Sequence, residues 1–147
     1  MNNPSKKSLK TAFDHFQTAE HLYHTTFPVA KNPKLLLAIV KSISNSLEYV
    51  LEAILIKEKL PLAKEPIKNI NAIRPLATKY HLSTDDITFM LRIQEILHAQ
   101  KQSPVEFQRG DRRIICSKDY ELEILSPIEG EQFLIQTKKI LNILNQP

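Results

Sequence analysis

Arg92 and His98 are the two residues of this chain whose types and spacing best fit a chemical role. They lie in the stretch FMLRIQEILHAQKQSP, which has the pattern of an amphipathic helix running into a loop at a proline. Histidine titrates near neutral pH and serves as a general acid or base, and arginine binds phosphate oxygens bidentately. Cleavage of an RNA phosphodiester without a metal needs both functions: proton transfer at the 2′-hydroxyl and leaving oxygen, and a cation at the phosphorane.

The same pair also fits a structural role. Six positions on an ideal helix correspond to about 600°, so the side chains of Arg92 and His98 point about 120° apart. Glu95 lies three residues from each, and it can pair with Arg92 or hold His98. An exposed Glu–Arg pair of this kind contributes only ~0.3–0.5 kcal/mol. We expect an enzyme to present two copies of the pair to one open groove. In a protein without activity the pair would be buried, splayed, or tied up by Glu95.

A second group of candidates is basic. The segment from 98 to 118 holds five Lys or Arg against two acids, a local net charge of +3. If it folds beside the end of the helix, its side chains flank His98 and hold an RNA backbone. The alternative is a solvated turn whose charges blunt a sheet edge. The candidate backbone-binding residues are Lys101, Arg109, Arg112 and Arg113.

Composition bounds the class of protein. The chain has 147 residues, 42% of them hydrophobic, which fits a single globular domain over 1–147. Its charge of +4 permits a nucleic-acid partner without requiring one. One cysteine excludes an intrachain disulfide framework, and the longest apolar run, LLLAIV, is too short to span a membrane. With no apolar leader after Met1, we expect a cytoplasmic protein without a membrane segment.

Hydrophobic periodicity predicts an all-α fold. Asn32 with Pro33, Ser83, and Ser126 with Pro127 mark the starts of three helices. The stretches RRIICS and YELEIL are β-prone and joined by SKD, which can turn. We expect a four-to-five-helix, up-and-down bundle with a small β-hairpin insert before the last helix. The expected helices cover about 5–25, 33–59, 84–100 and 127–145, with short helical pieces in 62–82 and the hairpin at 112–125.

The helix containing SISNSLEYVLEAIL, followed by RIQEILH at the end of the next long helix, resembles the HEPN superfamily. Members are small helical bundles, many with Arg-x(4–6)-His late in the chain, a window that Arg92-x5-His98 fits. The resemblance implies a metal-independent, cofactor-free endoribonuclease in which a homodimer brings two motifs into one cleft. It also implies a possible partner, a nucleotidyltransferase-type antitoxin. The alternative is a non-catalytic adaptor of the same fold that binds a protein or nucleotide.

The resemblance departs from the family pattern at Ile93, where active members often carry a polar residue. Asn45 or Glu48 on the preceding long helix are the candidates to supply a polar side chain instead. A homodimer is expected on a second ground as well. The helix over 33–59 carries apolar residues on more than one side, more than a small bundle readily covers.

The other residues with reactive side chains predict no further site. His21 and His24 are neighbours on a helix, but no carboxylate or cysteine spacing completes a metal site around them or around His15. Exposed helix histidines and no bound metal are therefore expected. Cys116, within IICS, is expected to be a small buried hydrophobic residue.

Overall fold

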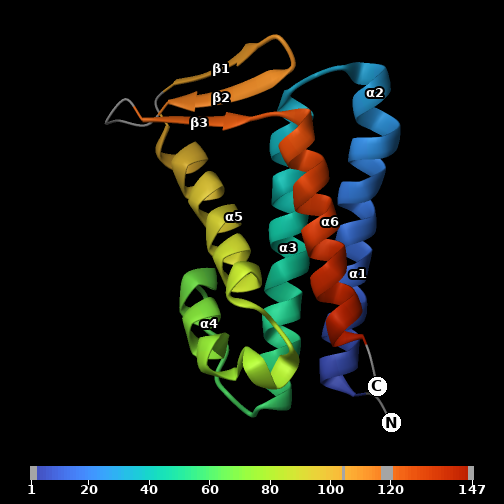
Figure 1. Cartoon of the computed structure of the whole chain (residues 1–147), viewed down its shortest axis with the longest axis vertical. Helices are drawn as coiled ribbons and strands as arrows, with labels where there is room; N and C mark the ends of the chain where they lie inside the picture. The colour runs from blue at the N-terminus through green and yellow to red at the C-terminus, as the bar shows by residue number, and fades with distance from the viewer. Residues whose placement is uncertain (1–2, 104, 117–120, 146–147) are drawn as a thin grey trace.

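Four long helices run alternately up and down, with a short helical segment at one end and a three-stranded antiparallel sheet at the other (Figure 1). This computed structural model describes residues 3–103, 105–116 and 121–145. The expectation of a mostly helical bundle with a strand insert before the last helix is confirmed. The helices are α1 (Pro4–His21), α2 (Phe27–Ala30), α3 (Lys34–Lys57), α4 (Pro66–Ile73), α5 (Thr84–Gln102) and α6 (Pro127–Leu144). The strands are β1 (Val105–Arg109), β2 (Arg112–Cys116) and β3 (Leu122–Leu125).

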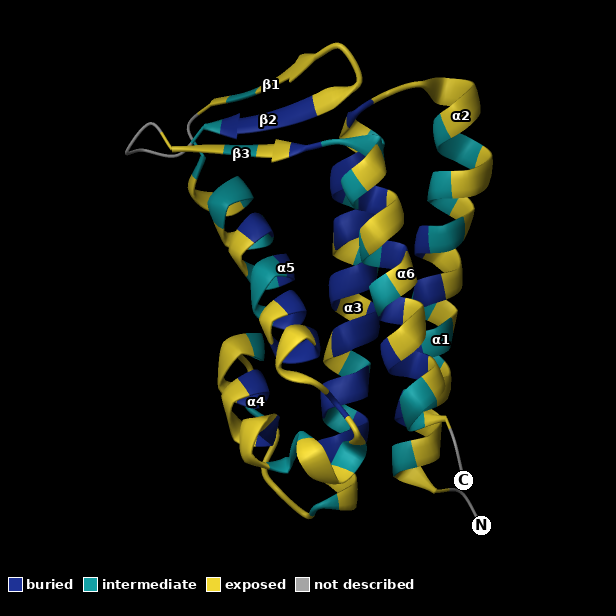
Figure 2. Cartoon of the chain, in the orientation of Figure 1, coloured by how far each residue is buried: buried dark blue, intermediate teal, exposed yellow. Residues whose placement is uncertain are grey.

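Helix α3 is the centre of the core. It packs against α1, α4, α5 and α6, and Figure 2 shows it as the most continuously buried helix. The apolar residues on more than one side of α3 are therefore covered within one chain. Ile56, near its end, stays exposed over 37% of its surface. The argument for a dimer from an uncovered α3 is wrong, because four neighbouring helices supply the missing cover.

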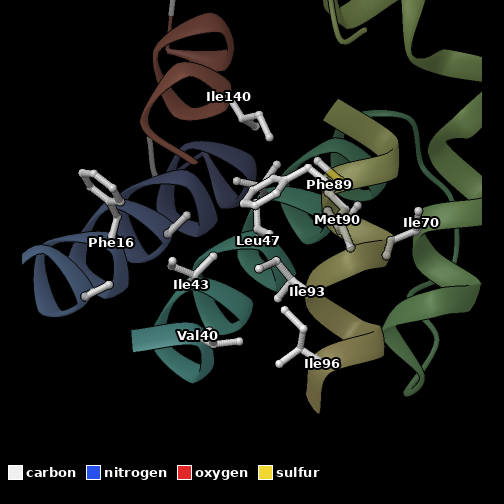
Figure 3. Packing of buried hydrophobic residues seen from close by; sticks show 14 of the residues in the cluster. Phe16, Val40, Ile43, Leu47, Ile70, Phe89, Met90, Ile93, Ile96 and Ile140 are labelled. Atoms are coloured by element: carbon white, nitrogen blue, oxygen red, sulfur yellow. The ribbon is translucent and has the colours of Figure 1, made fainter. Parts of the chain in front are cut away.

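The rotation of α5 about its axis is set by its apolar stripe. Figure 3 shows Met90, Ile93 and Ile96 of α5 directed at α3, where Ile43 and Leu47 lie. All five side chains are at most 2% exposed. Burial of one such side chain contributes about 1.5–3 kcal/mol, so the stripe fixes which face of α5 points inward. Ile93, the residue that follows Arg92, is thus an apolar core residue.

The first helix is longer than the pattern predicts. We expected TTFPVAKNP to end it near residue 25, but the chain continues through a π-helical turn at Leu22–Thr26 into α2. The π turn changes the hydrogen-bond register just before Pro28, which lies in the first turn of α2. Proline is tolerated in a first turn, where its missing N–H has no partner to lose. The helix ends at Lys31, whose φ of 48° is left-handed.

The sheet has one strand more than expected. The hairpin of β2 and β3 is confirmed, and its expected turn at 117–119 lies outside the described residues. Strand β1 was missed. It pairs with β2 through the two-residue turn Gly110–Asp111, in which Gly110 has a φ of +64°. A type II′ turn requires glycine at its first central position. The glycine of RGDR could therefore have predicted this hairpin from the sequence.

Candidate functional site

Helix α5, which carries Arg92 and His98, is anchored along its whole length. At its start, the Asp86 N–H donates to Ser83 Oγ at 3.1 Å, and the Ser83 N–H donates to Asp86 Oδ2 at 2.9 Å. In the middle, Gln94 Nε2 donates to Ser44 Oγ on α3 at 3.0 Å. At the end, the Ser103 hydroxyl lies 2.6 Å from two carbonyl oxygens of the paired strands β1 and β2. The two candidate side chains therefore project from a fixed support.

The Arg92 guanidinium is held by a carboxylate of the sheet. It forms an ion pair with Glu123 on β3, and both side chains are partly exposed, 35% and 23%. This hydrogen bond raises the pKa of Arg92 above its ordinary value, against the effect of partial burial. The charges of Glu123, Glu129 and Glu95 add to the rise. Within one chain, the Arg92 guanidinium thus already has Glu123 as an ion-pair partner.

Arg92 also lines a groove between α5 and α6 of about 630 Å³. The floor of this groove includes Phe89 and Phe133, whose ring centroids lie 5.8 Å apart. On the α6 side of the groove, Ile135 is 63% exposed. Ile128, two helical turns earlier on the same face of α6, is 69% exposed. The remaining lining residues are polar: Asp85, Thr88, Gln132, Gln136 and Lys139. Arg92 therefore stands beside an open, partly apolar surface.

His98 lies on the other flank of α5. It is exposed, and it is not among the residues that line the groove of Arg92. It follows Gln94 by one helical turn, and Gln94 marks the side of α5 that meets α3 at Ser44. Helical geometry sets it about 120° from Arg92 around the axis. Within a single chain the two candidates do not share a cleft.

Glu95 occupies the middle of the outward face of α5. It is exposed and lies about 60° around the axis from each of Arg92 and His98. The partner that ties up Arg92 is Glu123 rather than Glu95, although the charge of Glu95 also favours the cation. The pair is therefore splayed within the chain, with one member engaged and a carboxylate between them.

The supporting polar residues lie on α3. Asn45 and Glu48 are both exposed, and Glu48 follows Ser44 by one turn on the side that faces α5. Surrounding protein raises the pKa of Glu48 even though much of its surface is exposed, because part of the water around its carboxylate is displaced. The charges of Lys101 and His15 act in the opposite direction. Among the residues of α5, Lys101 is thus the one whose charge acts on Glu48.

The four basic candidates do not form one surface around His98. Arg113 is 8% exposed and its guanidinium bonds Glu106 Oε2 at 2.9 Å, on the inner side of the sheet. Lys101 is exposed in the last turn of α5. Arg109 and Arg112 are exposed at the β1–β2 turn, at the end of the sheet away from α5 (Figure 1). Strand β1 carries them ~20 Å from the end of α5, so the expectation that they flank His98 is wrong.

The remaining histidines and the cysteine have ordinary surroundings. His15 stacks on Tyr49 with ring centroids 5.4 Å apart, and His24 meets Tyr23 edge-on. Within the described residues, no three His, Cys, Asp or Glu side chains are grouped as metal ligands. Cys116 is half-buried rather than fully buried, because β2 places it on the outer face of the sheet.

Sequence reasoning missed Glu123 and Glu106 as partners of Arg92 and Arg113, and Ser44 as the partner of Gln94. Glu123 and Ser44 are far along the chain from the residues they bond, and no local pattern marks them. Glu106 is only seven residues from Arg113, and it was missed because strand β1 was missed. No described helix combines the length and apolarity that crossing a bilayer requires. No protein-family model, curated protein or solved structure matches the chain. The resemblance to the HEPN superfamily therefore depends on helix order and on the Arg92-x5-His98 motif.

Proposed function

We propose that this protein is a HEPN-like, metal-independent endoribonuclease whose active site forms between two copies of the chain. The proposal depends chiefly on one observation: Arg92 and His98 lie on either side of the outward-facing Glu95, three residues from it in each direction. All three side chains project from the half of α5 opposite its buried stripe. A second copy that packs on this half of α5 meets all of them at once.

Symmetry makes the arrangement self-complementary. In a two-fold, antiparallel pairing of α5 centred on Glu95, each residue lies level with the residue at the same distance on the other side of Glu95. Arg92 of one copy is then level with His98 of the second copy, at both ends of the interface. The exposed Ile128 and Ile135 of α6 beside the Arg92 groove supply apolar area for such an interface.

The chemistry follows from the two residue types. One His98 takes the proton of the 2′-hydroxyl, whose oxygen attacks the phosphorus, and the His98 of the second copy protonates the 5′ oxygen that leaves. Arg92 neutralises the phosphorane through two hydrogen bonds. Glu95, between them, accepts a hydrogen bond from the imidazole and fixes its orientation. The products are a 2′,3′-cyclic phosphate and a 5′-hydroxyl.

The test is cleavage of mixed single-stranded RNA in the presence of a chelator. Wild-type protein should cut it, and His98→Ala should lower the rate by ~10²–10⁴-fold while the melting temperature stays unchanged. Arg92→Ala should lower the rate by ~10²–10³-fold, and Arg92→Lys should recover little, because a point charge cannot form the bidentate contact. Intact RNA after hours with micromolar wild-type protein refutes the enzyme. Cleavage that persists in His98→Ala refutes the assignment of the site.

The second candidate is a non-catalytic adaptor of the same fold, with a protein or nucleotide partner such as a nucleotidyltransferase-type antitoxin. Two observations favour it: Arg92 and His98 are splayed within one chain, and the ion pair of Arg92 with Glu123 occupies the guanidinium that catalysis needs. In an adaptor this pair is a permanent brace between α5 and β3. The adaptor predicts intact RNA from wild-type protein, and also from every variant that releases Arg92.

A further inference from the structure

The face of the sheet that points away from the helices carries exposed apolar side chains on both edge strands. Cross-strand pairing fixes which side chains share it: Phe107, Ile114 and Ile124 form one row, and Val105 and Leu122 belong to the next. On the edge strands, Phe107, Ile124, Val105 and Leu122 are 42%, 37%, 51% and 56% exposed. Ile114, between them on β2, is 6% exposed. Figure 2 colours β1 and the start of β3 exposed or intermediate, and most of β2 buried. We call these five residues, with Arg109 and Arg112, the outer sheet face.

Charge is divided between the two faces of the sheet. Arg109 and Arg112 are direct cross-strand partners, so their side chains point to the same side as Phe107, two positions along β1. The strand carboxylates Glu106 and Glu123 alternate to the inner face, where they pair with Arg113 and Arg92. Among the described strand residues, the outer sheet face therefore holds two cations and no carboxylate.

We propose that the outer sheet face binds single-stranded RNA, with a base stacked on Phe107 and the neighbouring phosphates held by Arg109 and Arg112. This inference rests on the proposed function and names how its substrate is captured. Single-stranded nucleic acid is bound where an aromatic ring and cations lie together, because every base has a π-face and every nucleotide a charge. Residues two apart on a strand are ~7 Å apart, within the reach of one nucleotide and an arginine side chain.

Charge complementarity decides the occupant. A second copy placed sheet to sheet would bring four arginines together, and the described strands offer no carboxylate on the same faces to neutralise them, apart from Asp111 in the turn between each pair. An RNA strand brings both the planar apolar surface and the negative charge that this face lacks. Arg109 and Arg112, ~20 Å from α5, then act as a remote binding site for the strand whose scissile bond lies at His98.

Binding is measured with an oligouridylate of about 10 nucleotides, in the His98→Ala background so that no cleavage interferes. Phe107→Leu removes the ring and keeps an apolar side chain, and it should weaken binding by ~5- to 100-fold. Because the chain has no tryptophan, Phe107→Trp makes a single-tryptophan protein whose fluorescence the bases should quench on stacking. Quenching should saturate at the same RNA concentration as the binding curve.

Salt dependence tests the arginines. The double variant Arg109→Gln, Arg112→Gln should lower the slope of log affinity against log salt by ~1.4, about 0.7 per lost phosphate contact on a single strand. The matched control is Lys64→Gln, Arg74→Gln, which removes the same charge from exposed positions at the α4 end of the bundle. Its slope should equal that of the parent. Ile67→Ala, also exposed and at that end, is the control for Phe107→Leu.

Unchanged affinity in Phe107→Leu overturns the proposal, as does an unquenched tryptophan at saturating RNA. If Phe107→Leu instead halves the molecular mass and leaves RNA binding unchanged, the occupant of this face is a second copy. If the parent protein captures anionic vesicles but not RNA, the occupant is a membrane. Both results also overturn it. The proposed enzyme is tested separately: RNA that is bound through Phe107 but never cut by wild-type protein refutes the ribonuclease and leaves this binding face standing. In an active enzyme, Phe107→Leu should raise KM and leave kcat unchanged.

Discussion

Replacing Glu123 by glutamine should release Arg92 and separate the two candidate functions. The Arg92–Glu123 pair links α5 to β3 and is the main contact that holds the guanidinium in one chain. If Arg92 must leave Glu123 to reach the phosphorane, the pair competes with catalysis. Glu123→Gln keeps the size and polarity of the side chain and removes its charge. The variant should therefore lose stability and gain activity.

The size of both effects follows from exposure. A charged hydrogen bond contributes up to ~1.5–3 kcal/mol, but both partners here are partly exposed and solvent screens them, so we take ~1 kcal/mol. A pair of this strength leaves Arg92 open about one time in six, so its removal should raise the rate of RNA cleavage by ~6-fold. The same loss should lower the Tm of a chain of this length by about 2–4 °C.

The assay is chelator-resistant cleavage of single-stranded RNA, with Tm measured on the same preparations. Glu106→Gln is the matched control, since Glu106 forms the neighbouring ion pair on the inner face of the sheet, with Arg113. That variant should lose stability without gaining activity. A fall in activity of Glu123→Gln would refute the reasoning, because Glu123 would then help to position Arg92 instead of sequestering it. If neither wild-type protein nor Glu123→Gln cleaves RNA, and Glu123→Gln shows the expected fall in Tm, the result would support the adaptor.

Three further outcomes are expected. Multi-angle light scattering should give about twice the chain mass of 16.9 kDa, and a clean monomer at tens of micromolar would contradict a site formed between two copies. Ser83→Ala should lower the free energy of unfolding by about 1 kcal/mol, measured with denaturant, because the buried Asp86 loses its capping partner; an unchanged value would mean that the cap is redundant. Burial and Glu58 raise the pKa of Tyr80 to about 12 from its ordinary 10.0, so its contribution to stability is present below pH 10 and lost between about pH 10 and 12. In denaturant titrations repeated across this pH range, the free energy of unfolding of Tyr80→Phe should not show this loss. If it falls with pH in parallel with that of wild type, the assignment to Tyr80 is refuted.

Local patterns were enough to predict α5 and the way it carries the candidate residues. Ser83 specifies where the helix starts, and the apolar spacing specifies which face turns inward. With that face fixed, the 120° separation of Arg92 and His98 follows from 3.6 residues per turn. The same kind of reasoning predicted the strands β2 and β3, because alternation and β-branched residues are local signals.

Contacts between distant segments were beyond the reach of the sequence. Whether Arg92 is free or engaged depends on Glu123, which lies on a strand far along the chain. Whether Arg113 is a surface cation or a buried one depends on the register of β1 and β2, which places Glu106 beside it. Ion pairs form within about 4 Å, and only the folded chain brings these residues that close.

The sheet illustrates the same limit. Side chains alternate with a period of two, so a shift in register by one residue would exchange its faces. The sequence by itself determined only that Phe107, Arg109 and Arg112 are close neighbours along a basic segment, and that the residues from Arg112 onward are β-prone. The tertiary structure decided that these three share the uncovered face and that the carboxylates lie on the other, because the Gly110 turn and packing on the helices select one register.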